Sequence, residues 1–139
     1  MPRVLYQRLD DALLPLANKF YKSQGSNMRA GRSEQVWVAK ETEIIAACCL
    51  KVQDHGHWLT ALLVAQAQRQ QGIASALLQS LRRNTAGPIW LFCRPDLVGF
   101  YQQQGFQPAT HLPQALAHRL QRYQHKQALQ ALVSNGEND

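Results

Sequence analysis

No stretch of the sequence approaches the roughly 18 to 20 consecutive apolar residues that a membrane-spanning helix needs. Residues 1–4 likewise lack the apolar segment of a secretory signal peptide. Cysteine is scarce: the chain has only 3, and the adjacent pair Cys48 and Cys49 suggests no disulfide framework. We therefore expect a cytoplasmic protein without a membrane partner.

Acidic residues are outnumbered, because Asp and Glu total 9 against 15 Lys and Arg, which gives a net charge of +6. Such a charge can attract RNA, an acidic protein or a ligand that carries several phosphates. The sequence has no aromatic RNA-binding motif, helix-turn-helix spacing or zinc-finger spacing, so we do not expect a nucleic-acid partner. At 139 residues and 45% hydrophobic content, the chain suits a single domain over residues 1–139.

Linkers, repeats and low-complexity tracts are also absent, and short ordered elements follow one another from the N-terminus. A first strand is expected over residues 4–9. Asp10 or Asp11 can then cap a helix whose apolar residues recur every three to four positions. After a loop, three strands joined by tight turns predict an antiparallel meander, at residues 35–40, 44–52 and 57–64.

The second half of the sequence predicts crossover connections. A helix at residues 72–83 lies between the third meander strand and an apolar run at residues 89–93, which indicates a parallel strand pair. The elements expected beyond it are a helix at 95–104, a strand at 106–110, a long helix at 114–133 and a frayed tail at 134–139. The chain thus predicts a mixed α+β fold with flanking helices and its core in residues 4–110.

The segment at residues 62–74 carries the clearest chemical pattern. A strand passes through a short polar loop into the start of a helix, where backbone N–H groups lack partners and the helix dipole attracts negative charge. Gly72 and Ala74 let phosphates approach the backbone, and Arg69 adds a positive charge. The pattern suits a pyrophosphate but matches neither the Walker motif nor the dinucleotide-binding glycine motif. A packing glycine beside a solvated arginine is the other interpretation.

Two motifs resemble those of the GNAT N-acetyltransferases. Residues 69–74 match the family's R/Q-x-x-G-x-G/A signature, and residues 99–106 look like its FYxxxGF motif. The strand at residues 62–64 stands where the family has the strand that precedes the signature. The resemblance extends over residues 36–106 and more loosely over the N-terminal strand and helix. It implies the GNAT fold, in which one parallel strand pair splays apart around acetyl-coenzyme A (acetyl-CoA).

The resemblance also implies roles for matched residues. The pantetheine arm of acetyl-CoA would bond to the strand at residues 62–64 like an added strand, and the pyrophosphate would bind the loop amides. Tyr101 matches the tyrosine that protonates the departing thiolate, and core packing is its other interpretation. No metal is expected. The acetyl-CoA-binding residues expected are Leu62, Leu63, Val64, Arg69, Gln70, Gln71, Gly72, Ile73, Ala74, Ser75 and Arg94.

Several positions depart from the family pattern. Arg94 stands where asparagine is frequent, and it could meet a phosphate, an acidic group of the substrate or solvent. Gln66 replaces a common proline, and Ile89 replaces a glutamate that serves as the base in some members. The closing hairpin of the family gives way to the helix expected at residues 114–133. We therefore expect the substrate side of the pocket to be built differently.

Other polar and nucleophilic residues receive weaker assignments. The general base stays open between a relayed water and four side chains, Glu34, Asp54, His55 and His57. A metal site that joins the two histidines to the adjacent cysteines is disfavoured, because neighbouring strand residues point to opposite faces and no zinc spacing appears. Cys93 is expected to be a small buried residue and not an acyl-accepting nucleophile.

The last expected helix carries a basic cluster. A solvated face is the favoured interpretation of this cluster, and a face that binds RNA or a partner protein is the alternative. Its members are His118, Arg119, Arg122, His125 and Lys126.

Together these features predict an N-acetyltransferase. It would pass an acetyl group from acetyl-CoA directly to a primary amine in a ternary complex, with Tyr101 as general acid. One alternative is an acetyl-CoA-binding regulatory module with little or no activity that acts on a protein partner. Another is an RNA- or ribosome-associated acetyltransferase. The acceptor could be a small molecule or an amine of a protein or peptide, and the chain could be a monomer or a homodimer.

Overall fold

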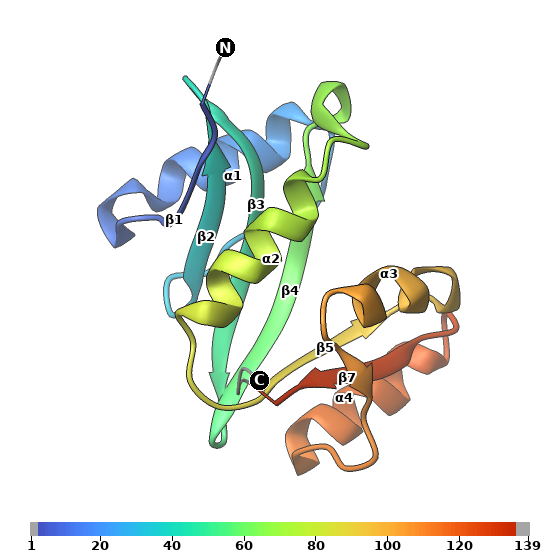
Figure 1. Cartoon of the computed structure of the whole chain (residues 1–139). Helices are drawn as coiled ribbons and strands as arrows, with labels where there is room; N and C mark the ends of the chain where they lie inside the picture. The colour runs from blue at the N-terminus through green and yellow to red at the C-terminus, as the bar shows by residue number, and fades with distance from the viewer. Residues whose placement is uncertain (1–2, 136–139) are drawn as a thin grey trace. The chain divides into compact units, whose positions relative to one another are not determined.

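Residues 3–135, which the computed structural model describes, form a mixed α+β fold with a seven-stranded sheet and four α-helices (Figure 1). The strands are β1 (Leu5–Arg8), β2 (Gln35–Lys40), β3 (Ile44–Gln53), β4 (Gly56–Val64), β5 (Ile89–Cys93), β6 (Gln107–Pro108) and β7 (Gln130–Ser134). The α-helices are α1 (Leu14–Ser23), α2 (Ile73–Arg83), α3 (Val98–Gln103) and α4 (Gln114–Gln124). The strand order is β1-β2-β3-β4-β5-β7-β6, which confirms the expected fold class.

The chain divides into two compact units, and both β3 and β4 contribute residues to each of them. Of the described residues, the first unit takes in 3–51 and 59–85, so it contains β1, β2, most of β3 and the end of β4 with α1 and α2. Of the described residues, the second unit takes in 52–58 and 86–135, so it contains the end of β3, the start of β4, and β5, β6 and β7 with α3 and α4. The single domain expected from the sequence stays a prediction.

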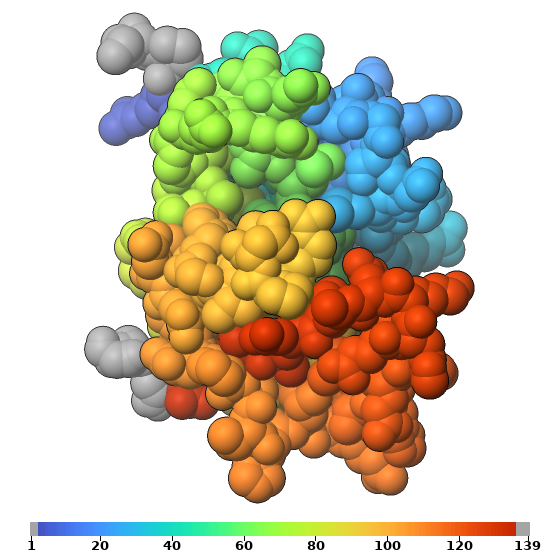
Figure 2. All heavy atoms as spheres, turned by 90° about the vertical axis from the view of Figure 1, so that its right-hand side faces the viewer, coloured from blue at the N-terminus to red at the C-terminus, as the bar shows by residue number. Residues whose placement is uncertain are grey.

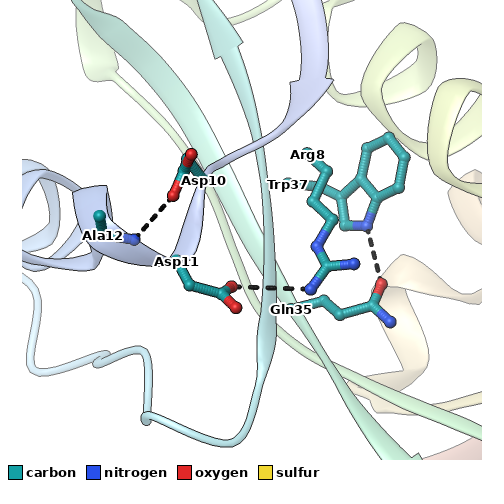
Figure 3. Close-up of polar contacts among 6 residues, drawn as sticks. All are labelled: Arg8, Asp10, Asp11, Ala12, Gln35 and Trp37. Atoms are coloured by element: carbon teal, nitrogen blue, oxygen red, sulfur yellow. Dashed lines mark hydrogen bonds and ion pairs between the residues drawn. The ribbon is translucent and has the colours of Figure 1, made fainter.

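The turn from β1 into the first helix begins with a side-chain cap, as the sequence predicts. The carboxylate of Asp10 accepts a hydrogen bond from the N–H of Ala12 at 2.9 Å (Figure 3). This bond opens a short 3₁₀ turn, η1 (Asp11–Leu13), which leads directly into α1. Arg8, the last residue of β1, lies 3.6 Å from the carboxylate of Asp11 on the other side of the turn. The cap therefore belongs to η1, whereas α1 itself begins after Leu13 without a side-chain cap.

Both faces of β2 are covered within the first unit. Val36 and Val38 pack in one core cluster with Ala17, Phe20 and Tyr21 of α1. Helix α2 contacts β1 and β2 and lies on the face of the sheet opposite to α1 (Figure 1). Strands covered on both faces do not need alternating polarity, and this explains why residues 36–39 of β2 are all buried. Strands β2 and β3 pair antiparallel, as expected for a meander.

In the second unit, β7 lies between β5 and β6 and is antiparallel to both. The start of β4 pairs in parallel with β5 through two residue pairs, His57 with Ile89 and Trp58 with Trp90. Helix α4 covers this part of the sheet, because its fully buried Leu116 packs in a cluster with Trp58 and Trp90. The parallel strand pair expected from the sequence is confirmed.

The prediction of a long helix at residues 114–133 is wrong for the second half of that range. Helix α4 ends at Gln124, and Gln130–Ser134 forms β7. Leu132 of β7 is fully buried and pairs with Leu91 of β5 on one side and Pro108 of β6 on the other. The apolar residues of this segment fit helical spacing, but the sheet supplies two strand edges with which they can pair. The hydrogen bonds to both edges favour the strand over the helix.

The same correction applies to the closing hairpin and to the tail. Strands β6 and β7 do pair antiparallel, and α4 is inserted in the connection between them. Ser134, expected in a frayed tail, is a buried residue of β7, 1% exposed. Residues 136–139 of that tail lie outside the described residues. The strand expected at residues 106–110 shortens to β6, because the fully buried Phe106 closes the end of α3.

Candidate functional site

The segment that follows β4 is held by side chains at both of its ends. The N–H of Ala65 bonds to the carbonyl of Ile45 in β3 at 2.8 Å, which keeps the loop beside the sheet. The N–H of Gln66 donates to Oε1 of Gln24 at 3.0 Å. The guanidinium of Arg69 folds back, and its Nε donates to the carbonyl of Val64 at 3.1 Å. The loop is thus attached to the first unit at several points before α2 begins.

The start of α2 presents a backbone surface with few side-chain atoms. Gly72 is its N-cap at φ 79°, and an added Cβ there would meet nothing within 4 Å. No side chain caps the helix, so the first N–H groups of α2 are not occupied by a capping residue. Gln70 also has a positive φ of 66°, and residues 69–72 are exposed. Open amides at the positive end of a helix dipole suit an anionic group.

The last part of β4 contains a backbone irregularity that the sequence does not reveal. Ala61 has a φ of 59°, which is rare for a residue with a side chain and is unusual within a strand. Its carbonyl accepts a hydrogen bond from the hydroxyl of Tyr21 at 2.7 Å. The expected pantetheine-binding residues, Leu62 to Val64, follow directly and are partly buried. The structure therefore brings this strand end, the loop and the start of α2 together in the first unit.

Two other predicted site residues belong to the second unit. Tyr101 lies in α3, is 9% exposed, and packs edge-on against the rings of Phe100 and Phe106. The N–H of Phe106 donates to the carbonyl of Tyr101 at 3.1 Å and closes the helix. Arg94 precedes η3 (Pro95–Leu97) and binds the carboxylate of Asp96 through two nitrogens, at 3.2 and 3.0 Å. The structure thus pairs Arg94 with an acidic side chain of the protein itself, a contact that the sequence did not predict, and its role toward a ligand stays a prediction.

The candidates for a general base are placed in different surroundings. Glu34 accepts a hydrogen bond from the N–H of Gly31 at 2.6 Å, so this carboxylate closes a loop. Asp54 and His55 form the turn before β4. His57 has a buried Nδ1 with no hydrogen-bond partner, and burial lowers the pKa of its imidazole. The base stays unassigned.

The cysteines are poor nucleophiles in this fold. Burial, and secondarily the charge of Asp96, raises the pKa of the Cys93 thiol, which disfavours the reactive thiolate. Burial also raises the pKa of Cys48 well above its usual value. No group of histidine, cysteine or acidic side chains within residues 3–135 is arranged to hold a metal ion. Within the same residues, no helix is both long and apolar enough to span a bilayer.

The basic cluster of α4 is only partly a solvated face. Residues 121–128 are all exposed, and the end of α4 forms part of the surface in Figure 2 (orange to red). Arg119 differs, because its guanidinium lies 4.8 Å above the ring of Trp58. Tyr123 lies edge-on against Phe92 of β5 at 6.3 Å between ring centroids. These contacts attach α4 to the sheet by its polar side as well as by Leu116.

A pocket of about 500 Å³ opens in the second unit, and its lining includes none of the residues that the sequence singled out as cofactor-binding. Its wall includes Trp90, Pro108, Thr110 and His111 together with the turn residues Asp54 and His55. His55 lies edge-on against Trp90 at 5.5 Å between ring centroids. No motif in the sequence predicts this pocket, because its residues come from four separate segments.

Comparison with known proteins identifies the class. Residues 32–108, more than half of the chain, match the family model of the acetyltransferase (GNAT) domain. The chain therefore belongs to the GNAT acetyltransferase family, as its two motifs predict. No curated protein matches it.

Solved structures share the fold at low sequence identity. One is an N-acetylglutamate synthase from Neisseria gonorrhoeae, complexed with coenzyme A and N-acetyl-glutamate, which is 16% identical to this chain with a TM-score of 0.70. The match covers 99% of this chain but only 36% of the synthase. The ribosomal-protein-S18-alanine N-acetyltransferase of Escherichia coli is 15% identical at a TM-score of 0.66, over 99% of this chain and 96% of that one.

A third solved structure is similar over its whole length. The diaminobutyrate acetyltransferase of Paenibacillus lautus, in complex with L-2,4-diaminobutyric acid and coenzyme A, is 13% identical at a TM-score of 0.66. The match covers 100% of this chain and 99% of that one. Identities this low show the common fold, and the coenzyme A in two of these structures agrees with the expected acetyl donor.

Proposed function

We propose that the protein is an N-acetyltransferase that moves an acetyl group from acetyl-CoA to a primary amine. One observation carries the proposal: the family signature coincides with an uncapped helix start, where Gly72 leaves open space over the first amides of α2. Such a start binds an anion through backbone N–H groups and the helix dipole. The exposed Arg69 adds a positive charge next to it. A pyrophosphate matches this combination.

The proposed reaction is a direct transfer in a ternary complex. The amine nitrogen attacks the carbonyl carbon of the thioester, a backbone N–H of β4 stabilises the developing oxyanion, and the carbon–sulfur bond then breaks. Tyr101 gives its phenolic proton to the departing thiolate, the attacking nitrogen releases a proton to water as it becomes the amide, and a proton from water restores the phenol. A water or a side chain must first remove the extra proton of the amine. Most of the rate would come from positioning the amine against the thioester.

The acceptor is proposed only as a class. The similar structures include enzymes whose names specify a small amine and a ribosomal protein, and both classes stay open for this chain. The alternative of a weakly active or inactive regulatory module would be favoured by the absence of a closing strand pair. The antiparallel pairing of β6 with β7 removes that argument.

Isothermal titration of acetyl-CoA and free CoA tests the site. The wild type should bind with a Kd in the micromolar range, and an Arg69→Ala, Gly72→Asp double variant should not. Aspartate tolerates a left-handed backbone better than most residues, so the loss would come from its charge against the pyrophosphate. Arg122→Ala, on the exposed end of α4, is the matched control and should bind normally. Absence of binding by the wild type would contradict the proposal, and measurable binding would justify a screen of amine acceptors.

A further inference from the structure

We propose that Tyr21 is a positioning residue for acetyl transfer. Its hydroxyl fixes the peptide group between Ala61 and Leu62, so that the N–H of Leu62 is directed toward the thioester carbonyl of bound acetyl-CoA. This inference rests on the proposed function, because it assigns a role within the same site. It concerns a contact between α1 and β4 that lies wholly in the first unit.

The irregular backbone of Ala61 needs an external cause. At φ 59° the Cβ of an L-residue crowds its own backbone, and alanine has no side-chain polar group that could compensate locally. Glycine would adopt this conformation freely, but the chain has alanine there. The conformation must therefore be held by surrounding structure, and the hydroxyl of Tyr21 lies 2.7 Å from the carbonyl oxygen of Ala61.

The geometry of the peptide group means that the hydrogen bond from Tyr21 to the carbonyl of Ala61 also sets the direction of the N–H of Leu62. No cis peptide bond occurs in the described residues, so the group between Ala61 and Leu62 is trans. In a trans peptide the C=O and the following N–H point in opposite directions in one plane. Because the C=O of Ala61 points at Tyr21 in the core, the N–H of Leu62 points away from Tyr21. A hydrogen bond that restrains the carbonyl restrains this N–H equally.

The hydroxyl of Tyr21 is a permanent donor. The side chain is 0% exposed, and burial raises the pKa of its phenol far above the usual value. Cys49 lies 3.7 Å from the same hydroxyl. Burial raises the pKa of Cys49 to about 11, so it is a neutral thiol that can donate to the tyrosine oxygen. The chain of bonds from Cys49 through Tyr21 to Ala61 therefore stays intact over the working pH range.

Packing alone does not explain why position 21 carries a tyrosine and not a phenylalanine. A phenylalanine ring would fill the same volume among the residues of the core cluster, and a buried hydroxyl costs free energy unless it is bonded. The bond of this hydroxyl to the carbonyl of Ala61 meets that cost and adds a restraint on the backbone of β4 that the ring alone does not supply. Stabilising an oxyanion requires a donor that is aligned before the reaction begins, and such alignment is what the Tyr21 bond provides.

The experiment compares acetyl-CoA with free CoA in Tyr21→Phe. The thioester carbonyl is present only in acetyl-CoA, so the variant should lose affinity for acetyl-CoA while its Kd for CoA stays unchanged. Turnover should fall about 10-fold, less than the roughly 10²- to 10³-fold loss seen when an oxyanion donor is deleted outright. Tyr6→Phe, a partly buried tyrosine of β1, is the matched control and should change neither ligand's affinity.

A second variant separates positioning from general stability. In Ala61→Gly the backbone strain is relieved, so the further effect of Tyr21→Phe on turnover should be smaller than in the wild-type background. Equal effects in both backgrounds, or an equal loss of CoA and acetyl-CoA affinity in Tyr21→Phe, would assign the hydroxyl a purely structural role and overturn the inference. Failure of the wild type to bind either ligand would instead remove the proposed function itself.

Discussion

Gln66 shows how a residue that departs from the family pattern can be compensated by another. Proline has no backbone N–H, and its ring would stiffen the loop after β4. Gln66 has an N–H, and this group donates to Oε1 of Gln24 at 3.0 Å. The hydrogen bond attaches the loop to the segment that follows α1. The loop is therefore attached by a side chain that is distant in sequence. The replacement of proline by glutamine at position 66 does not by itself reveal this contact.

Tyr101→Phe should lower turnover on the order of 10²-fold and leave the Kd for acetyl-CoA within about twofold of the wild type. The substitution removes the acidic proton but keeps the ring that packs against Phe100 and Phe106. Steady-state kinetics combined with titration calorimetry would measure both quantities. The control is Tyr123→Phe in α4, which should behave as the wild type. Unchanged turnover in Tyr101→Phe would exclude the phenol from the mechanism.

His57 should make the protein less stable at mildly acidic pH. Burial lowers the pKa of this imidazole in the folded state, whereas the unfolded chain has the usual value of about 6.5. As pH falls through 6.5, the unfolded state binds the proton first, so the free energy of unfolding decreases. Above that pH both states are neutral and His57 adds no slope.

Urea unfolding at several pH values between about 5.5 and 8 would measure this effect, since carboxylates stay ionised there. His57→Gln should remove part of the decline, because the glutamine does not titrate. His118→Gln, at an exposed position of α4, should keep the decline. An identical pH profile in wild type and His57→Gln would contradict the assignment.

At the scale of the element, the C-terminal segment shows where sequence periodicity fails. Residues 128–133 place apolar side chains at positions that suit either a helix or a strand. The structure resolves the ambiguity through β5 and β6, whose edges both pair with β7. A strand between two others gains ladder hydrogen bonds that no local pattern records.

The start of β4 should tolerate no side chain at position 56. A Cβ on Gly56 would overlap the carbonyl oxygen of Pro88 and lie 2.9 Å from the ring of Trp90. Gly56→Ala should therefore destabilise the protein by about 3 kcal/mol, measured by urea or thermal unfolding. Gly99→Ala is the control: an added Cβ meets nothing within 4 Å in α3, and better helix propensity should stabilise by about 0.5 kcal/mol. Equal stability of the two variants would show that the strand start can shift.

At the scale of the whole molecule, the open question is cooperativity. Compact units of this kind can unfold separately or together. We expect one domain, so the amides of Val38 in β2 and Leu91 in β5 should exchange with the same free energy of opening. Native-state hydrogen exchange in low denaturant would measure both. Two different plateaus, one for each unit, would contradict the single-domain prediction.

The sequence by itself determined the elements whose signals are local. The cap at Asp10, the strand at residues 35–40 and the helix start after Gly72 all depend on neighbouring residues, and they lie where the sequence predicts them. The family followed from the two motifs. Local signals suffice in these cases because capping, turn formation and amphipathic spacing involve contacts within a few residues.

Only the tertiary structure decided which distant groups meet. The strand β7 and the bond from Tyr21 to Ala61 were not predicted. Tyr21 and Ala61 are 40 positions apart, and a positive φ at alanine leaves no trace in residue type. A strained backbone persists only where surrounding packing holds it, so its location is a property of the folded chain and not of any segment read alone.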